Sequence, residues 1–221
     1  INTVANPDIG SGKLDGEGIP PDFFSDPDLR KGFAYAFDGD ALLRDSFKGT
    51  AVRAHGPIPP GVPGHDKSLA GYPYDLKKAE QHLRKAWGGK LWQVGFKFTA
   101  TYNNGGEARM SAAQILKKNV ESLNPKFQMN LRGVDWASFV DKGQRRLMPL
   151  FGRGWVADFP DAHNFVFPFY HSQGRYGSAQ GFADAQLDAL IEKAAAEPSP
   201  AKRAALYKKV LARGRELSPT I

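Results

Sequence analysis

The 221-residue chain contains no cysteine, which excludes disulfides, thiolate metal ligands and cysteine nucleophiles from this sequence. It also has no apolar run of the length that a membrane helix needs. Glycine-rich phosphate loops, dinucleotide fingerprints and the Gly-x-Ser-x-Gly turn of serine hydrolases are missing as well. The sequence therefore predicts no disulfide framework, no nucleotide-phosphate loop and no serine-hydrolase site.

Positive charge is in excess, with 30 Lys and Arg against 23 Asp and Glu, for a net charge of +7. The basic residues come as pairs on separate predicted helices, and acidic residues interleave with most of them. These pairs are Lys77-Lys78, Lys117-Lys118, Arg145-Arg146 and Lys208-Lys209. Such spacing is typical of solvated helix faces rather than of a phosphate-binding stripe, so no nucleic-acid partner is predicted.

Periodicity predicts an α/β fold. Alternating apolar residues predict strands over 94–102 and 127–134, and the apolar run 147–151 predicts a third strand. Helical spacing over 112–123, and again after Asp135, places a helix between each pair of strands. This order predicts an open, mostly parallel sheet with helices on both faces.

The flanking sequence completes one domain. Residues 1–25 are rich in Gly, Pro and Asp and predict an irregular linker, whereas residues 26–221 predict a single α/β lobe. The proline-rich stretch 49–74 predicts a long ordered loop or a linker, and the residues after Pro160, rich in Asp, His, Asn and Phe, predict another loop. Two amphipathic helices close the chain. Both ends have the composition of an interrupted segment, so we expect a piece of a longer chain.

The candidate binding site lies where two predicted strands end. The carboxyl ends of parallel strands meet along one edge of a sheet, and open α/β sheets bind ligands there. The expected ligand-binding residues at this edge are Tyr102, Asn103, Asn104, Arg153, Trp155, Asp158 and Phe159. The alternative is a strand followed by a solvated turn, with Trp155 in the core and Asp158 capping its own turn.

No catalytic residue, metal site or cofactor is predicted. Oxygen and nitrogen donors do occur close together, at Asp158, Asp161, His163 and His171, but their spacing matches no known ligand motif. A metal-assisted hydrolase that uses the first three of these residues remains as an alternative from another functional class.

Five segments carry a resemblance to a known family, all in family order. They are 26–38, 56–59 with 72–79, Tyr102-Asn103 with the helix after it, Gly154-Trp-Val-Ala-Asp158, and 182–191 with 203–207. Together they resemble the periplasmic oligopeptide/dipeptide-binding proteins, which are family 5 of the solute-binding proteins of ABC importers. The resemblance implies a two-lobed, non-enzymatic receptor that closes on a peptide and delivers it to a membrane permease. It would then be periplasmic or extracytoplasmic, and associated with the membrane through the importer or a lipid anchor. Residues 1–25 would come from the missing second lobe, and 26–221 would form the solute-binding lobe.

The resemblance also assigns a role to Asp158. In peptide-binding members, the matching Asp pairs with the free α-amino group of the peptide. Some members carry a basic residue at the position of Gly152, whereas here the basic residue is Arg153, which alternation would place on the opposite strand face. Related members bind oligosaccharides or nickel complexes, and both remain as alternative cargoes.

Overall fold

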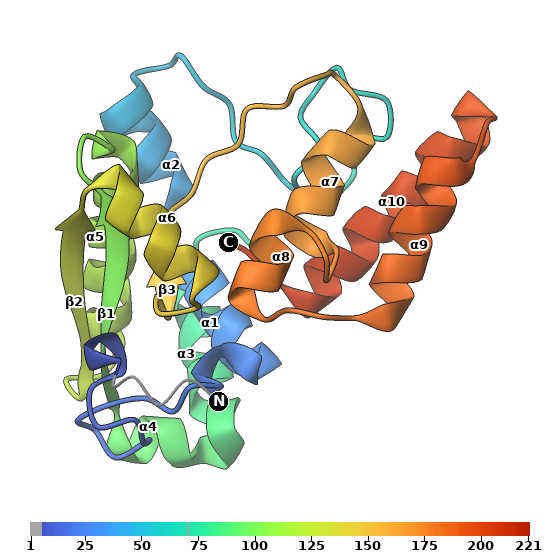
Figure 1. Cartoon of the computed structure of the whole chain (residues 1–221). Coiled ribbons are helices and arrows are strands. Elements are labelled where there is room, and N and C mark those ends of the chain that lie inside the picture. Colours follow the sequence, from blue (N-terminus) through green and yellow to red (C-terminus); the bar gives the residue numbers. More distant parts are fainter. Residues whose placement is uncertain (1–5, 70) are drawn as a thin grey trace. The chain divides into compact units, whose positions relative to one another are not determined.

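The computed structural model describes residues 6–69 and 71–221, which form two compact units (Figure 1). The first unit comprises residues up to 53, residues 73–153 and residue 221, and the second comprises residues 54–72 and 154–220. The single lobe predicted over 26–221 spans both units. In the described part of the chain, no helix is both long and apolar enough to cross a membrane.

Three parallel strands form the sheet of the first unit, in the order β2-β1-β3. They are β1 (Phe96–Asn103), β2 (Phe127–Val134) and β3 (Leu150–Phe151). Helices α5 (Glu107–Leu123) and α6 (Trp136–Gln144) connect them. The two connections step across the sheet in opposite directions, so right-handed crossovers place these helices on opposite faces (Figure 1). The predicted α/β fold is confirmed.

Two further helices of the first unit begin at caps that the sequence shows. Asp26 accepts hydrogen bonds from the backbone N–H groups of Asp28 and Leu29, and Asp75 caps the helix that follows it. The α-helices are α1 (Pro27–Ala36), α2 (Gly39–Leu42), α3 (Leu76–Lys85) and α4 (Lys90–Val94). The 3-10 helices are η1 (Pro7–Ile9), η2 (Phe23–Ser25) and η4 (Ala86–Gly89), and η3 (Leu43–Phe47) is a π-helical turn.

The aromatic core of the first unit lies on one face of its sheet. Phe96 of β1 stacks on its register partner Phe127 of β2, with ring centroids 4.6 Å apart. Phe98 lies two residues along the same face, where Phe33 of α1 and Val120 of α5 join the cluster. Burying each of these side chains contributes about 1.5–3 kcal/mol. This core therefore fixes the sheet and the edge at which its strands end.

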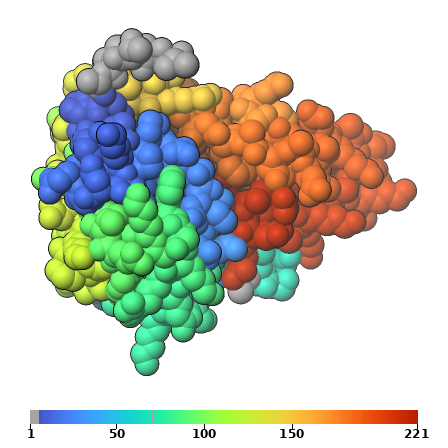
Figure 2. All heavy atoms as spheres, turned by 90° about the horizontal axis from the view of Figure 1, so that it is seen from below, coloured from blue at the N-terminus to red at the C-terminus, as the bar shows by residue number. Residues whose placement is uncertain are grey.

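The segment before α1, predicted as an irregular linker, contributes to this core. Leu14, Ile19 and Phe23 are buried, and Figure 2 shows this segment (blue) against the green surface of α3 and α4. The indole Nε1–H of Trp87 donates to the Phe23 carbonyl at 3.1 Å, which ties the two segments together. The part of the linker prediction that concerns residues 1–5 lies outside the described residues.

The second unit is helical. It consists of α7 (Ala162–Tyr170), α8 (Arg175–Gln180), α9 (Ala185–Ala196) and α10 (Pro200–Leu217), with the loop 54–72. Val166, Leu187, Ile191 and Val210 form the centre of its core, and Ile58 joins them from the loop. The two amphipathic helices predicted at the end of the chain are α9 and α10.

Three sequence-based predictions are wrong in detail. Val94 belongs to α4 rather than to the strand, because Gly95 adopts φ +81° and a Cβ there would lie 2.3 Å from the Lys126 carbonyl. The strand predicted over 147–151 is only Leu150–Phe151, because the Leu147 N–H closes the end of α6 on Lys142 and Pro149 has no N–H to donate.

The third error is the loop predicted after Pro160, because residues 162–170 form helix α7. Its buried side chains Ala162, Val166 and Tyr170 follow one another at four-residue spacing, behind the cap Asp161. The proline at position 168 concealed this pattern, because proline inside a helix removes a backbone hydrogen bond and is uncommon.

Candidate functional site

Tyr102, Asn103 and Asn104 lie where β1 ends, as predicted, and Asn103 is held tightly. It is 9% exposed, its Oδ1 accepts from Arg109 Nη1 at 2.5 Å, and its Nδ2 donates to the Asn104 carbonyl at 3.0 Å. Asn104 is exposed, and a Cβ on Gly133 of β2 would lie 2.3 Å from its Oδ1. Arg109, in the first turn of α5, is a residue that the sequence reasoning missed, since no motif marks it.

Arg153 follows β3 and lies against aromatic side chains of α6. Its guanidinium carbon is 5.0 Å from the Trp136 ring centroid and 5.3 Å from that of Phe139. Trp136 itself is 53% exposed, so the cation lies beside an accessible aromatic surface. Alternation along a strand was expected to place Arg153 on the face opposite Gly152. It does not apply to Arg153, because the strand ends at Phe151.

In the second unit, the segment 154–159 is tied to α7 through a residue that the sequence reasoning missed. Asn164 Oδ1 accepts from the indole Nε1–H of Trp155 at 3.1 Å and from the backbone N–H of Asp158 at 3.3 Å. The Trp155 ring also meets Phe169 and Tyr176 edge to face, with centroids 6.5 and 5.8 Å away. The role of Asn164 depends on the helix over 162–170. That helix was not predicted from the sequence, so Asn164 was not found.

Asp158 and Phe159 are exposed. Across residues 6–69 and 71–221, no hydrogen bond or ion pair involves the Asp158 carboxylate. The turn-capping role considered for Asp158 belongs to Asp161, which accepts from the His163 N–H at 2.8 Å. Of the seven predicted site residues, Trp155, Asp158 and Phe159 thus belong to the second unit, and the other four belong to the first.

Asp161 also anchors the end of this segment to α10. Its two oxygens accept from Arg203 Nη1 at 2.6 Å and from Nη2 at 2.8 Å, a bidentate pair. The hydrogen bonds from Arg203 lower the pKa of Asp161 below its ordinary value of 3.8. The carboxylate therefore stabilises the fold while it is ionised.

This pKa shift predicts an acid-dependent loss of stability. The unfolded chain takes up the proton at higher pH than the folded chain does, so the contribution of Asp161 is complete above about pH 5 and is lost as pH falls below 3.8. The unfolding temperature, measured from pH 7 down to pH 3, should fall less steeply for Asp161→Asn than for the wild type. Asp141→Asn, at an exposed ion pair, should leave the slope nearly unchanged. Equal slopes for Asp161→Asn and the wild type would contradict the assignment.

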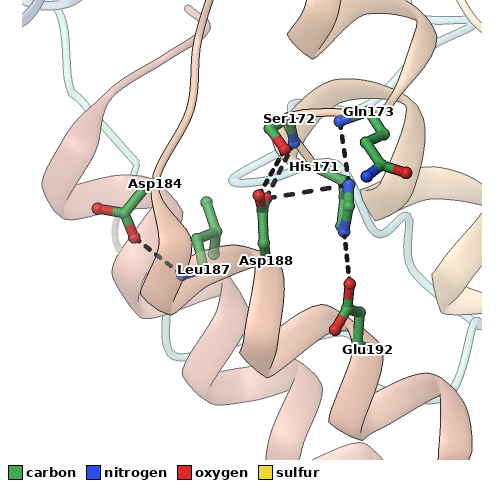
Figure 3. A network of polar contacts seen from close by, with 7 residues as sticks. All are labelled: His171, Ser172, Gln173, Asp184, Leu187, Asp188 and Glu192. Atoms are coloured by element: carbon green, nitrogen blue, oxygen red, sulfur yellow. Dashed lines mark hydrogen bonds and ion pairs between the residues drawn. The ribbon is translucent and has the colours of Figure 1, made fainter.

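His171, at the end of α7, belongs to a network of polar contacts with α9 (Figure 3). Its Nδ1 accepts from the Gln173 N–H at 3.1 Å and its Nε2 lies 3.4 Å from Glu192 Oε1.

Among the described residues, no three His, Asp or Glu side chains are grouped so that they could hold a metal ion. Asp161, one of the three residues of the hydrolase alternative, is paired with Arg203.

The family model of bacterial extracellular solute-binding proteins, family 5 (middle part), matches residues 10–177, which is most of the chain. The chain therefore belongs to the family 5 bacterial extracellular solute-binding proteins. The curated relatives named below are both binding proteins.

The chain is also similar to two curated relatives and one solved structure. Di/tripeptide-binding protein 2 of Pseudomonas aeruginosa is 26% identical over 84% of this chain and 35% of its own length. Heme-binding protein A of Haemophilus influenzae is 24% identical over 84% of this chain and 34% of its own length. The periplasmic binding protein DppA of Helicobacter pylori, solved with the peptide STSA, has 22% identity and a TM-score of 0.78 over 89% of this chain and 38% of that one. The chain thus spans about a third of the length of these curated relatives.

Proposed function

We propose that this chain is the ligand-contacting part of an extracytoplasmic receptor that binds short peptides and passes them to the membrane permease of an ABC importer. The observation that carries the proposal is the segment 154–159. It presents an exposed carboxylate without a partner in the described residues, Asp158, three residues after an indole whose ring is fixed by its neighbours. A free carboxylate beside an apolar wall suits the α-ammonium group and first side chain of a peptide.

Family membership supports this proposal, and so does the name of the Pseudomonas relative, a di/tripeptide-binding protein. Trp155, Asp158 and Phe159 are the proposed ligand contacts of the second unit. Tyr102, Asn103, Asn104 and Arg153 are the proposed contacts of the first. The rest of the receptor would supply a second lobe and the attachment to the importer or to a lipid anchor.

A ligand screen of the whole receptor tests the proposal. Di- and tripeptides with a free amino group should raise its melting temperature, whereas N-acetylated peptides should raise it much less. Oligosaccharides, haem and nickel complexes form the other arms of the screen, because relatives in this family differ in cargo. Stabilisation by one of these arms alone, with no response to any peptide, would overturn the peptide proposal and keep the receptor class.

A further inference from the structure

Asn164 joins two parts of the proposed ligand segment through a single oxygen atom. The residue is 9% exposed, and its Oδ1 accepts both the Trp155 indole N–H at 3.1 Å and the Asp158 backbone N–H at 3.3 Å. A buried oxygen that accepts two donors from residues 155 and 158 closes this short stretch of chain onto α7. Loss of that oxygen would leave two N–H groups without their partner.

We propose that Asn164 is a positioning residue that fixes the Trp155 indole and the Asp158 backbone before ligand arrives. The inference rests on the proposed function only for its consequence for ligand binding. Asn164 touches Trp155 and Asp158, and its effect on ligand passes through them. Asn164 itself lies outside the candidate site that was predicted from the sequence.

The same geometry defines what Trp155 offers to a ligand. The only hydrogen-bond donor of its side chain, Nε1–H, is used by Asn164, and Phe169 and Tyr176 meet its ring edge to face. Trp155 therefore acts through the apolar surface of its ring and not as a hydrogen-bond donor. It follows that a ligand gains specificity from the Asp158 carboxylate, and packing area from the indole.

A fixed segment lowers the ordering cost of binding. If Asn164 holds residues 155–158 in the binding geometry, the ligand does not have to order them. Removing the oxygen frees the segment, so we expect affinity for free-amine peptides to fall about tenfold, which corresponds to one or two net hydrogen bonds. N-acetylated peptides, which lack the ammonium group that Asp158 would bind, should lose much less.

The experiment compares Asn164→Ala with the isosteric Asn164→Asp in the whole receptor. Hydrogen exchange at the Trp155 indole N–H and the Asp158 amide is measured without ligand, and affinity is measured for trialanine and N-acetyl-trialanine. Asn164→Ala should speed exchange at both sites and reduce the preference for trialanine about tenfold, as estimated above. Asn164→Asp keeps an acceptor at the same place and should keep exchange slow. Asn164→Ser, whose shorter side chain does not extend as far, carries the same readouts if the alanine variant does not fold.

Asn119→Ala is the matched control. Asn119 is also 9% exposed, and its Nδ2 donates to the Ala36 carbonyl at 2.8 Å in the first unit. This variant should lower the melting temperature but leave exchange at Trp155 and the trialanine preference unchanged. If Asn164→Ala behaves in the same way, Asn164 is only a structural residue and the inference is overturned. If the wild type binds no peptide, the proposed function fails, and the exchange rates alone still decide the role of Asn164.

Discussion

The substitution Asp158→Asn is expected to weaken the binding of free-amine peptides to the whole receptor by about 30-fold to several thousand-fold, or about 2–5 kcal/mol. The amide keeps the shape of the side chain but removes the charge opposite the proposed ligand ammonium. An ammonium group enclosed on binding would then lack its counter-charge, and this loss is larger than any loss of contact area. Calorimetric titration of wild type and variant with trialanine measures the effect.

The ligand itself provides one control for this prediction. N-acetyl-trialanine has no ammonium group, so its affinity should change by less than about threefold in the Asp158→Asn variant. Asp141→Asn provides the other control, because it removes an acid that is exposed and in a surface ion pair with Arg145. It should leave both affinities unchanged. Equal losses for the free and the acetylated peptide would remove Asp158 from the ammonium site.

The order of the sheet elements was predictable because local periodicity carries it. The alternation that ends at Tyr102, the helix after Gly106 and the helix capped by Asp135 are properties of neighbouring residues. They specify β1, α5, β2 and α6 before any tertiary contact is known. The third strand was overestimated because its neighbours decide it: Leu147 hydrogen-bonds back to α6 instead of joining the sheet.

The residues proposed for the site follow from the sequence, whereas the contacts that hold them in place do not. Trp155 and Asp158 stand out by residue type, whereas Asn164 acquires its role only once α7 brings its side chain to the segment before that helix. Arg109 is similar, since it reaches Asn103 only because α5 begins close to the end of β1. Contacts of this kind depend on how a helix is placed, and a single sequence carries no periodic signal for them.

The burial of Asp8 was not predictable either, because composition suggests that a charged side chain in this segment is solvated. Asp8 of η1 is fully buried, with Oδ1 2.6 Å from Arg132 Nη1 of β2 and Oδ2 3.5 Å from Lys142 Nζ of α6. The Asn6 side chain fixes the same turn by donating to the Leu147 carbonyl at 3.1 Å. One buried anion thus joins the segment before α1 to a strand and a helix of the sheet.

This arrangement predicts an asymmetric cost of mutation. Arg132→Gln leaves a fully buried carboxylate with only Lys142 nearby, and should lower the free energy of unfolding by about 3 kcal/mol, the lower end for a broken buried pair. Asp8→Asn leaves two cations that are partly exposed and can be hydrated, so it should cost about 1–2 kcal/mol. The double variant should be about as stable as Asp8→Asn alone, because no buried charge is then left unpaired.

Chemical denaturation of the four proteins measures these values, with Lys97→Gln as the matched control. Lys97 pairs with Glu17 at 3.5 Å on the surface, where both side chains are well exposed, so its loss should change stability by less than about 0.5 kcal/mol. The prediction depends on the order of the costs rather than on their absolute size. If Asp8→Asn costs as much as Arg132→Gln and the two add in the double variant, the buried anion is not what joins the segment to the sheet. The apolar contacts of Leu14, Ile19 and Phe23 would then hold it without the ion pair.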